Sequence, residues 1–472
     1  RVDPQSFRLR PDRRLQPLKA PVMRQKIAII GSGISGLGTG YLLSPHHDVT
    51  IYEADHRPGG HSHTVDVHVD GQRFGVDTGF LVFNERTYPL LCRLFANIQV
   101  PVVKSDMSFS VKIAEPDLEW AGTNLDSVFA QRRNLLRPAF WGMLRDILRF
   151  NKGATRDLDN PALTDVSLGE YLDSHRYGRA FRDDYLLPMA AAIWSCPTEQ
   201  MLAYPFNTFV RFCHNHGLLQ IIDRPTWMTV AGGSRTYVAM LIDAIRKHGG
   251  HLHLESPVTA VVRAADHVHV TTTQGSASYD QIIMACHSDQ ALQILGADAT
   301  PQEQSHLASI RYQANRAVLH TDPTLLPENR KAWAAWNYAS PGSTSKALGK
   351  SPVSVSYLLN KLQPLPTENP VIVTLNPWHE PDPARTLRQI HYAHPVFDGP
   401  AVAAQATIKR LSGLNRTLYA GAWLGYGFHE DGFASAVRAA AQLVPLPDWL
   451  LGAQPELNEI ELSAHTPVVA HS

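Results

Sequence analysis

The chain has 472 residues, of which 44% are hydrophobic and 18% are charged. These values are typical of globular proteins, and the length predicts two domains or one intertwined pair. Lysine plus arginine and aspartate plus glutamate each number 43, so the formal net charge is zero. This balance argues against a nucleic-acid-binding protein, which usually has a strong basic excess.

Cysteine spacing, hydropathy and the first residues narrow the class further. The four cysteines are far apart, which favours reduced thiols in a cytoplasmic protein over a disulfide framework or a zinc site. No apolar run reaches 18 residues, so we expect no membrane span. Residues 1–22 contain six lysine and arginine residues but no apolar stretch of a secretory signal. We expect this segment to be a disordered tail or tag before a natural start at Met23.

A glycine cluster marks the first predicted element. The apolar run Ile27 to Ile30 meets Gly31-x-Gly33-x-x-Gly36, and a helical pattern begins at about Ser35. This order of strand, glycine turn and helix is the one that binds dinucleotides. Gly31 allows the tight turn, Gly33 lets the backbone approach a pyrophosphate, and Gly36 lets helix and strand pack closely. The helix N-terminus adds free N–H groups and partial positive charge.

An acidic residue follows at the expected distance. Glu53 ends a second predicted strand, "DVTIYEA", 17 residues after Gly36. Its carboxylate can accept hydrogen bonds from both ribose hydroxyls, whereas it would repel a 2′-phosphate. The sequence therefore disfavours NADP and leaves FAD and NAD as alternatives.

A second glycine pair favours FAD. "GGHSHTV" places Gly59-Gly60 shortly after Glu53, and "VDTGF" follows with its last residue at Phe80. The first segment resembles the "GG-R-x-x-T" segment of the flavin amine oxidase and phytoene desaturase-like superfamily, which lies along the cofactor's phosphates and ribityl chain. His61 replaces the usual arginine, and a neutral imidazole can still donate one hydrogen bond. In the superfamily, the segment like "VDTGF" approaches the isoalloxazine ring.

Residues 226–286 resemble a second piece of the same domain. A stripe of Val238, Leu241, Ile242 and Ile245 predicts a helix that ends at Gly249-Gly250. Four strands are expected after it, in "HLHLE", "VTAVVR", "HVHVTTT" and "YDQIIMACH". The resemblance implies that the backbone of Val258 holds the adenine.

A third piece lies near the C-terminal end, in "TLYAGAWLGYGFHEDGFASAVRAAAQLV". We expect a strand from Leu418 to Ala420, then Gly421, and a helix with Asp431 as its N-cap. In the superfamily this segment lies against the flavin's pyrimidine side, where the helix dipole favours the reduced form. Ala422-Trp423 replaces the usual acid, so the loop contacts need not be shared.

Together these segments predict an α/β protein with a Rossmann-like FAD-binding domain of the glutathione reductase type, interleaved with an α+β substrate-binding domain. "PMAAAIWSCP", "TLNPWHEP" and "GAWLGYGFHEDGFASA" resemble a narrower family of bacterial NAD/FAD-binding proteins associated with cyclopropane-fatty-acid synthases. The expected FAD-binding domain comprises residues 23–86, 225–299 and 404–447. The substrate-binding domain comprises 87–224 and 300–403, and 448–472 form a C-terminal tail.

The inserted segments are expected to differ in structure. The first is mostly helical, while the proline-rich second insert favours an antiparallel sheet with strands in "AVLHTD", "PVSVSYLLNKL" and "PVIVTLN". Within the first insert, residues 135–150 form a basic amphipathic helix. Two interpretations remain open, a core-facing helix with solvated arginines and a helix that docks on an anionic membrane. The expected apolar face comprises Phe140, Trp141, Leu144, Ile147 and Leu148, beside Arg132, Arg133, Arg137, Arg145 and Arg149.

No metal or hydrolase centre is predicted. The pairs His61/His63 and His214/His216 lack a clear third ligand, and no Ser-His-Asp arrangement emerges. A flavin enzyme needs neither, because its cofactor performs the hydride transfer. We expect FAD bound without a covalent link, held by Gly31, Gly33, Ser35, Gly36, Glu53, Ala54, Gly60, His61, Thr78, Gly79, Phe80, Val258, Gly421, Asp431, Gly432 and Phe433.

The expected function is hydride transfer from an apolar substrate, such as a lipid acyl chain, to flavin N5. The alternatives are an amine oxidase that produces H2O2, a redox-neutral flavin isomerase, and a non-catalytic partner of a lipid-modifying enzyme. A fatty-acid-modifying methyltransferase is the candidate partner, and the expected location is the cytoplasm or the inner membrane face. The candidate pocket residues are Phe80, Trp194, Trp336, Tyr338, Trp423, Tyr426 and Phe428.

Overall fold

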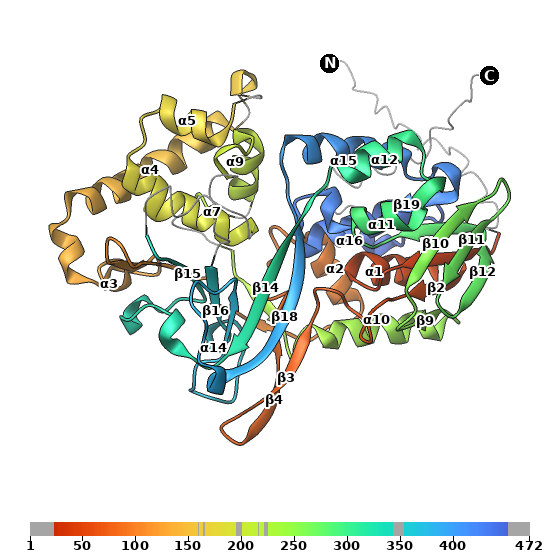
Figure 1. The fold of residues 1–472 in the computed structure, drawn as a ribbon, viewed down its shortest axis with the longest axis horizontal. Helices are drawn as coiled ribbons and strands as arrows, with labels where there is room; N and C mark the ends of the chain where they lie inside the picture. Colours follow the sequence, from red (N-terminus) through yellow and green to blue (C-terminus); the bar gives the residue numbers. More distant parts are fainter. Residues whose placement is uncertain are drawn as a thin grey trace, which may run out of the picture.

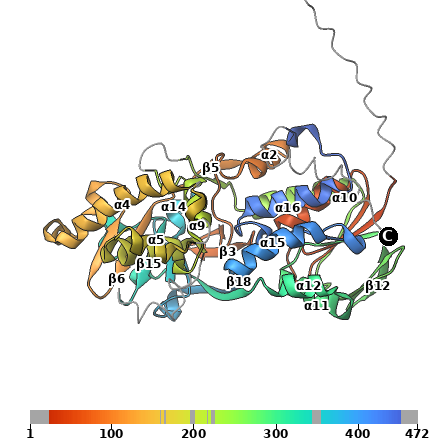
Figure 2. The same ribbon diagram turned by 90° about the horizontal axis from the view of Figure 1, so that it is seen from above.

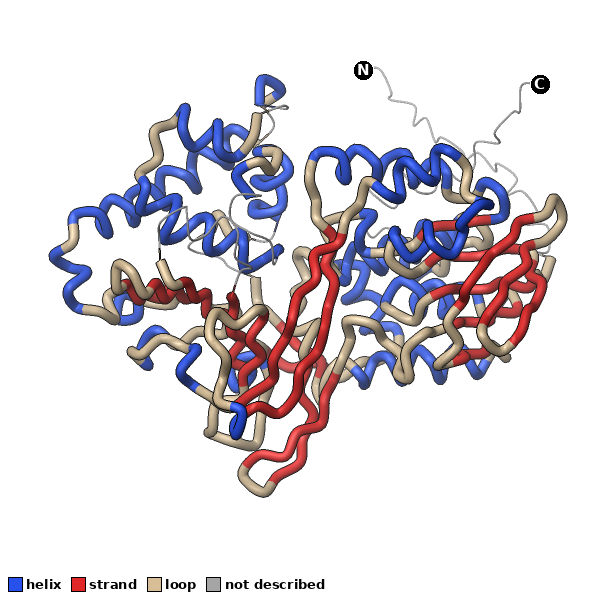
Figure 3. The backbone as a smooth tube through the Cα atoms, in the orientation of Figure 1, coloured by secondary structure: helices blue, strands red, loops and turns tan. Residues whose placement is uncertain are grey.

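The computed structural model describes residues 23–158, 160–163, 166–194, 201–215, 217–220, 225–342 and 354–451. Figure 1 shows two sheets side by side along the long axis, each with its own helices. The long strands β14 and β18 run between the two halves (Figure 3).

A parallel sheet of five strands forms the first half, in the order β19-β13-β1-β2-β9. Its central strand β1 pairs with β2 and β13, so that Ile29 lies between Ile51 and Ile283. All three side chains are fully buried, as the continuous apolar runs of a two-faced parallel sheet require. The strands are β1 (Lys26–Ile30), β2 (Asp48–Tyr52), β9 (His251–His253), β13 (Gln281–Met284) and β19 (Thr417–Tyr419).

Each face of this sheet packs against a different layer. Ile27 and Ile29 belong to a core shared with helices α1, α2, α10 and α16, whereas Ala28 and Ile30 face a core shared with β10–β12 and three further helices. The first set is α1 (Ile34–Leu43), α2 (Pro89–Asn97), α10 (Arg235–Lys247) and α16 (His429–Ala441). The second layer contains β10 (Val258–Arg263), β11 (Val268–Thr272), β12 (Gly275–Tyr279), α11 (Ser288–Leu295), α12 (Pro301–Ala308) and α15 (Gly399–Leu411).

A mostly antiparallel sheet of seven strands forms the second half, in the order β18-β14-β17-β16-β15-β6-β7. Only the pairing of β15 with β6 is parallel among these neighbours. The first insert therefore supplies the last two strands at one side of the sheet, β6 and the edge strand β7, which were not expected from the sequence. The strands are β6 (Phe109–Ile113), β7 (Leu118–Ala121), β14 (Tyr312–His320), β15 (Trp336–Ser340), β16 (Ser354–Leu358), β17 (Ile372–Leu375) and β18 (Thr386–Pro395).

Helices of the first insert cover one end of this sheet (Figure 2). Their aromatic side chains join the strands in one apolar core, in which Phe150, Tyr171 and Phe206 are fully buried. The helices are α3 (Leu125–Val128), α4 (Pro138–Asp157), α5 (Leu168–Ser174), α6 (Arg179–Phe181), α7 (Leu187–Trp194) and α9 (Phe206–Asn215), with α14 (Leu359–Leu362) after β16.

Two short ribbons connect the halves. In the first ribbon, β3 (Thr64–Val69) pairs with β4 (Gln72–Asp77), and in the second β5 (Val102–Lys104) pairs with β8 (Met228–Val230). The carboxylate of Asp77 accepts from the backbone N–H and hydroxyl of Ser234 at 2.9 and 2.7 Å. Gln363 also donates to it, at 3.1 Å. This buried acid therefore ties β4 to the start of α10 and to the segment after α14.

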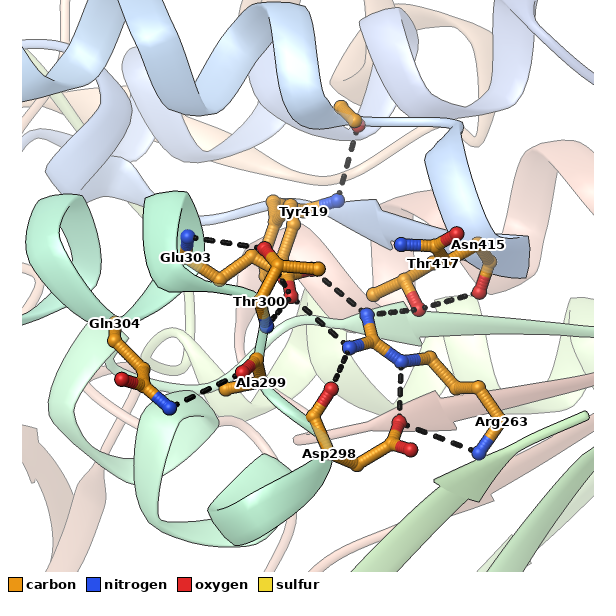
Figure 4. Close-up of polar contacts among 10 residues, drawn as sticks. Arg263, Asp298, Ala299, Thr300, Glu303, Gln304, Asn415, Thr417 and Tyr419 are labelled. Carbon is orange, nitrogen blue, oxygen red and sulfur yellow. Dashed lines mark hydrogen bonds and ion pairs between the residues drawn. The ribbon is translucent and has the colours of Figure 1, made fainter.

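A buried ion-pair network holds β10, α12 and β19 together (Figure 4). The Arg263 guanidinium donates to Asp298 at 2.6 Å and to both carboxylate oxygens of Glu303 at 2.7 and 2.9 Å. The Tyr419 hydroxyl donates to Glu303 at 2.7 Å. Because the Arg263 and Glu303 side chains are only 5% and 4% exposed, each charge is stabilised by its partner instead of by water.

The start of α16 and the buried face of α4 differ from what the sequence predicted. Helix α16 begins at His429 rather than at Asp431, which lies in its first turn and accepts from the Phe428 backbone N–H at 2.9 Å. Asp431 is therefore not the N-cap residue, because the helix begins two residues before it and Phe428 takes the N-cap position. On α4, Phe140 faces the core but Trp141 and Leu148 are 50% and 57% exposed, so the predicted apolar stripe is divided between core and solvent.

Among the described helices, none is long and apolar enough to cross a membrane.

Candidate active site

One cavity of about 760 Å³ extends from the carboxyl edge of the parallel sheet to the seven-stranded sheet. Its lining includes Gly31 beside β1, Gly79 after β4 and Gly421 after β19, segments that are far apart in the sequence. Trp336 and Leu375 line it from the second sheet. The carboxyl edge of a parallel sheet is where ligands bind in doubly wound folds.

The glycine turn lines this cavity with backbone rather than side chains. Gly31 has a φ of +104°, which other residues rarely adopt, and a Cβ on Gly36 would lie 1.9 Å from the Gly31 carbonyl oxygen. A Cβ on Gly33 would meet no atom within 4 Å. Gly31 and Gly36 are therefore required by the fold, whereas the open space at Gly33 belongs to the cavity.

Glu53 lines the cavity at the end of β2 and contacts the turn directly. Its Oε2 accepts from the Ser32 backbone N–H at 2.9 Å and from the Ser32 hydroxyl at 2.5 Å. Its Oε1 accepts from the Asp55 backbone N–H at 2.9 Å. The carboxylate therefore orders the turn and still has free lone pairs for a ligand hydroxyl.

A second loop closes the cavity opposite the turn. Gly60 has a φ of +56°, and a Cβ there would lie 3.3 Å from the Gly33 Cα. The backbone N–H of Phe80 donates to the His61 carbonyl at 2.9 Å, which joins this loop to the segment after β4. The Thr78 hydroxyl and the Tyr392 hydroxyl share a hydrogen bond of 2.8 Å, so the loop is also fastened to β18.

Four histidines line the cavity as neutral imidazoles. Burial lowers the pKa of His429 to about 3, and burial with the neighbouring His287 lowers the pKa of His394 to about 4. Burial and nearby imidazoles hold the pKa of His61 below the usual value, and burial alone does so for His287. Among the described lining residues, Glu53 is the only acidic side chain, and no lysine or arginine is present.

Aromatic and aliphatic side chains form the wall near the second sheet. Phe80 stacks on His429 at 3.8 Å between ring centroids, and Phe428 stacks on Phe212 at 5.1 Å. Trp336 meets Tyr357 edge-on at 4.8 Å. Further apolar lining comes from Met107, Ile193, Leu218, Trp227, Val373, Leu375, Phe397, Trp423 and Tyr426.

The structure brings most of the sequence-predicted residues to this cavity. The lining includes Gly31, Gly33, Ser35, Glu53, Ala54, Gly60, His61, Thr78, Gly79, Phe80, Val258, Gly421, Trp336, Trp423, Tyr426 and Phe428.

The remaining predicted residues lie elsewhere. Gly36 and Gly432 serve helix packing, since a Cβ on Gly432 would lie 2.7 Å from Ile34. Phe433 and Tyr338 are buried in the apolar cores, and Asp431 is in the first turn of α16. Of these five, none lines the cavity in the described part of the chain. The side chain of Trp194 lies outside the described residues.

Sequence reasoning missed several lining residues. Cys286 and His287 follow β13, whose neighbour β1 ends at the glycine turn, so adjacency of the two parallel strands could have identified them. Tyr392 and His394 alternate on β18 and line the cavity from the same side of that strand. Their pairing with the first half depends on tertiary structure and leaves no local sequence pattern. Tyr357 was missed for the same reason.

Neither a disulfide nor a metal centre is found among the described residues. Cys92, Cys213 and Cys286 are free thiols, while Cys196 lies outside the described chain. No group of three or more potential ligands is close enough to hold a metal ion in the described part. His216 of the pair His214/His216 is also outside it.

Comparison with solved structures supports the fold. Over 89% of this chain and 98% of the other, cyclohexylamine oxidase from Brevibacterium oxydans superposes with a TM-score of 0.62 at 16% identity. A fatty acid isomerase from P. acnes that produces CLA gives 0.62 at 15% identity over 87% and 97%. Putrescine oxidase bound to putrescine gives 0.62 at 13% identity over 90% and 99%.

Sequence comparison identifies the family. A 41-residue stretch is 54% identical to coproporphyrinogen III oxidase from Staphylococcus aureus, although it covers only 8% of this chain and 9% of that protein. The family of flavin containing amine oxidoreductases matches residues 34–444, most of the chain. The chain therefore belongs to the flavin containing amine oxidoreductase family.

Proposed function

We propose that the chain is an FAD-dependent oxidoreductase that takes a hydride from an uncharged, apolar substrate, with a lipid acyl chain as the favoured class. The observation that carries this proposal is the continuity of the cavity, which joins the glycine turn to an aromatic and aliphatic wall. Glu53, at the turn, is the only acidic side chain in its described lining, which contains no lysine or arginine. A charged substrate would find no countercharge at the apolar end.

The residues at the turn fit a flavin dinucleotide. The open space at Gly33 and the first N–H groups of α1 suit a pyrophosphate, and Glu53 suits the ribose hydroxyls. His61 Nε2 is buried without a hydrogen-bond partner among the described residues, so a ligand acceptor there would satisfy it. Val258 and Gly421 line the same cavity and remain our proposed contacts to the adenine and the flavin ring.

When bound, the flavin would accept the hydride at N5, and the chain would supply position and exclude water. The hydrogen bond between Thr78 and Tyr392 holds the loop against the second sheet. The stacked Phe80 and His429 rings and the wall at Phe428 would hold an apolar chain in a dry environment. The neutral imidazoles keep that environment free of positive charge.

We propose that the cofactor is bound without a covalent link. Among the described residues, Cys286 is the cysteine that lines the cavity, and burial raises its pKa to about 12. It is therefore a thiol rather than a nucleophilic thiolate at neutral pH. Acid precipitation should release all FAD into the supernatant. Yellow colour that stays with the protein pellet would contradict non-covalent binding.

Three alternatives share the same cavity. An amine oxidase would use the aromatic residues around Phe428 to hold a neutral amine and would release H2O2. A flavin isomerase would return the hydride to the same acyl chain, and a fatty acid isomerase has the same fold. A non-catalytic partner of a fatty-acid-modifying methyltransferase would bind FAD without turnover, consistent with the resemblance to proteins associated with cyclopropane-fatty-acid synthases.

Anaerobic reduction distinguishes these functions. Purified holoprotein is mixed with phospholipids bearing unsaturated, saturated or cyclopropane acyl chains, or with primary and secondary amines, and flavin absorbance is followed. We expect an acyl lipid to bleach the flavin, with the desaturated product identified by mass spectrometry. Bleaching by amines with H2O2 after aeration would establish the amine oxidase instead. Double-bond migration without net reduction would establish the isomerase, and no chemistry with any compound would favour the partner.

A further inference from the structure

Exposed apolar side chains are concentrated at the far end of the second half. Of twelve large hydrophobic residues that are exposed in the described chain, five lie between residues 125 and 148. They are Leu125 (77% exposed), Leu135 (45%), Leu136 (86%), Trp141 (50%) and Leu148 (57%). Single exposed apolar residues are ordinary, but such a concentration indicates an interaction site.

These side chains belong to one continuous surface. The 3₁₀ helix η1 (Arg132–Leu136) connects α3 to α4, and the Trp141 indole N–H donates to the Leu135 carbonyl at 3.0 Å. Phe129, just after α3, packs on Trp141 at 5.3 Å between ring centroids. We call this region, from Leu125 to Leu148, the α3–α4 surface. Figure 1 shows it at the end of the molecule opposite the parallel sheet.

The surface is also positively charged. Residues 125–148 contain four arginines and two aspartates, an excess of two positive charges in a chain with a formal net charge of zero. One of the two aspartates, Asp146 on α4, is buried. The Arg145 side chain is 75% exposed, so a cation lies on the outer face of this helix between Trp141 and Leu148.

The outward side chains of α4 are accessible to a partner without any unfolding of the helix. Phe140, Met143 and Phe150 anchor α4 in the core with at most 4% exposure, and the Asp146 carboxylate accepts from the Gly178 backbone N–H at 2.8 Å. The helix is therefore held rigidly with Trp141, Arg145 and Leu148 outward. Of the apolar stripe that the sequence suggested for membrane docking, Trp141 and Leu148 thus face outward, whereas Phe140 is buried.

We propose that the α3–α4 surface docks on the headgroup region of an anionic phospholipid bilayer. Exposed leucines and a tryptophan surrounded by arginines match the interface between acyl chains and headgroups, where arginine binds phosphate and tryptophan prefers to lie. The positive excess is complementary to anionic lipids. Docking would hold the protein beside the acyl lipids that we propose as its substrate class, although binding is testable without that function.

Vesicle binding of the FAD-loaded protein tests the proposal. Co-sedimentation is measured with phosphatidylcholine vesicles that contain or lack 30% phosphatidylglycerol, at about 0.1 M salt. We expect binding to the anionic vesicles only, weakened about tenfold by Leu136→Ser with Trp141→Ser and about tenfold by Arg145→Glu. Matched controls are Trp378→Ser, which alters a tryptophan that is 38% exposed elsewhere, and Arg410→Glu on α15; both should bind like the wild type.

The result can overturn the proposal independently of catalysis. Equal binding to neutral vesicles, no binding, or weakening by the control variants alone would each reject the α3–α4 surface as an anionic-lipid site. Flavin content and thermal unfolding of each variant confirm that the fold is intact. Reduction of the flavin by substrate in detergent should be unchanged in the docking variants, so failure of one proposal leaves the other standing.

Discussion

Glu303 is a carboxylate whose surroundings determine its charge. Burial opposes its ionisation, but hydrogen bonds from Arg263 and Tyr419 outweigh burial and lower its pKa from 4.5 to about 2. Because the pKa is lower in the folded state, the stabilisation is complete above about pH 4.5 and is lost as the pH falls towards 2. The network of Figure 4 is therefore an acid-sensitive element of the fold.

Removing this charge should destabilise the protein strongly. We expect Glu303→Gln to lower the free energy of unfolding by about 3–5 kcal/mol at pH 7, because it removes the buried carboxylate of the network and leaves Arg263 with Asp298 as its one charged partner there. The loss should shrink when urea unfolding is repeated at pH 3. Glu380→Gln is the matched control, since Glu380 pairs with Arg316 but is 65% exposed, and it should cost less than about 1 kcal/mol. Equal losses for the two variants would contradict the buried network.

Two glycines of the same turn should respond differently to substitution. Gly33→Val extends into the open cavity and should change unfolding by no more than about 1 kcal/mol, but it should greatly reduce the FAD retained per chain. Gly36→Ala places a Cβ against the Gly31 carbonyl and should prevent stable folding. Absorbance at the flavin bands and circular dichroism measure the two effects. Full FAD occupancy in Gly33→Val would remove the turn from the proposed cofactor site.

At the scale of elements, α4 has an inner and an outer face. Phe140 is 4% exposed and Leu148 is 57% exposed, although both belong to the stripe read from the sequence. Phe140→Ala should destabilise by about 3–5 kcal/mol through the cavity it leaves, whereas Leu148→Ala should change stability by less than about 0.5 kcal/mol. Urea unfolding checks both values, and a larger effect of Leu148→Ala would reverse the assignment of the faces.

The elements predicted best from the sequence are those whose patterns are local. The run Ile27 to Ile30, the glycine turn and the stripe on α10 each specify one element with its buried face, and all three are observed. The start of α16 was misplaced because Asp431 is a good capping residue that lies within the first turn. The strands β6 and β7 escaped prediction because they are short, and because β6 joins the sheet by pairing with β15, more than 200 residues away in the sequence.

The same distinction applies to the candidate site. Positions near the glycine turn could be predicted because a pyrophosphate requires close backbone approach, which only particular residue patterns provide. Tyr392, His394 and Tyr357 could not be predicted, because no local sequence pattern marks a side chain that lines a cavity from a distant sheet. The apolar end of the cavity is thus defined by tertiary packing, and this is why the sequence identified only some members of its wall, such as Trp336 and Phe428.

At the scale of the whole molecule, the cavity couples the two halves. Its lining includes Gly31 and Glu53 from the first half and Tyr392 and His394 from β18 of the second sheet, and Tyr392 is hydrogen-bonded to Thr78. A ligand that fills the cavity contacts both halves at once. Any affinity for the folded state then stabilises both sheets together, rather than the parallel sheet alone.

FAD should therefore raise the stability of the whole chain in one step. Free FAD at 100 times its Kd should add about 2.7 kcal/mol to the free energy of unfolding. Hydrogen exchange should slow at the glycine turn and also at Tyr392 and His394 on β18. Comparison of apoprotein and FAD-loaded protein by calorimetry and mass spectrometry measures both effects. The cofactor would instead bind to the parallel-sheet half without reaching β18 if protection from exchange were confined to the turn. A thermal transition of the second half whose temperature does not change with FAD would mean the same.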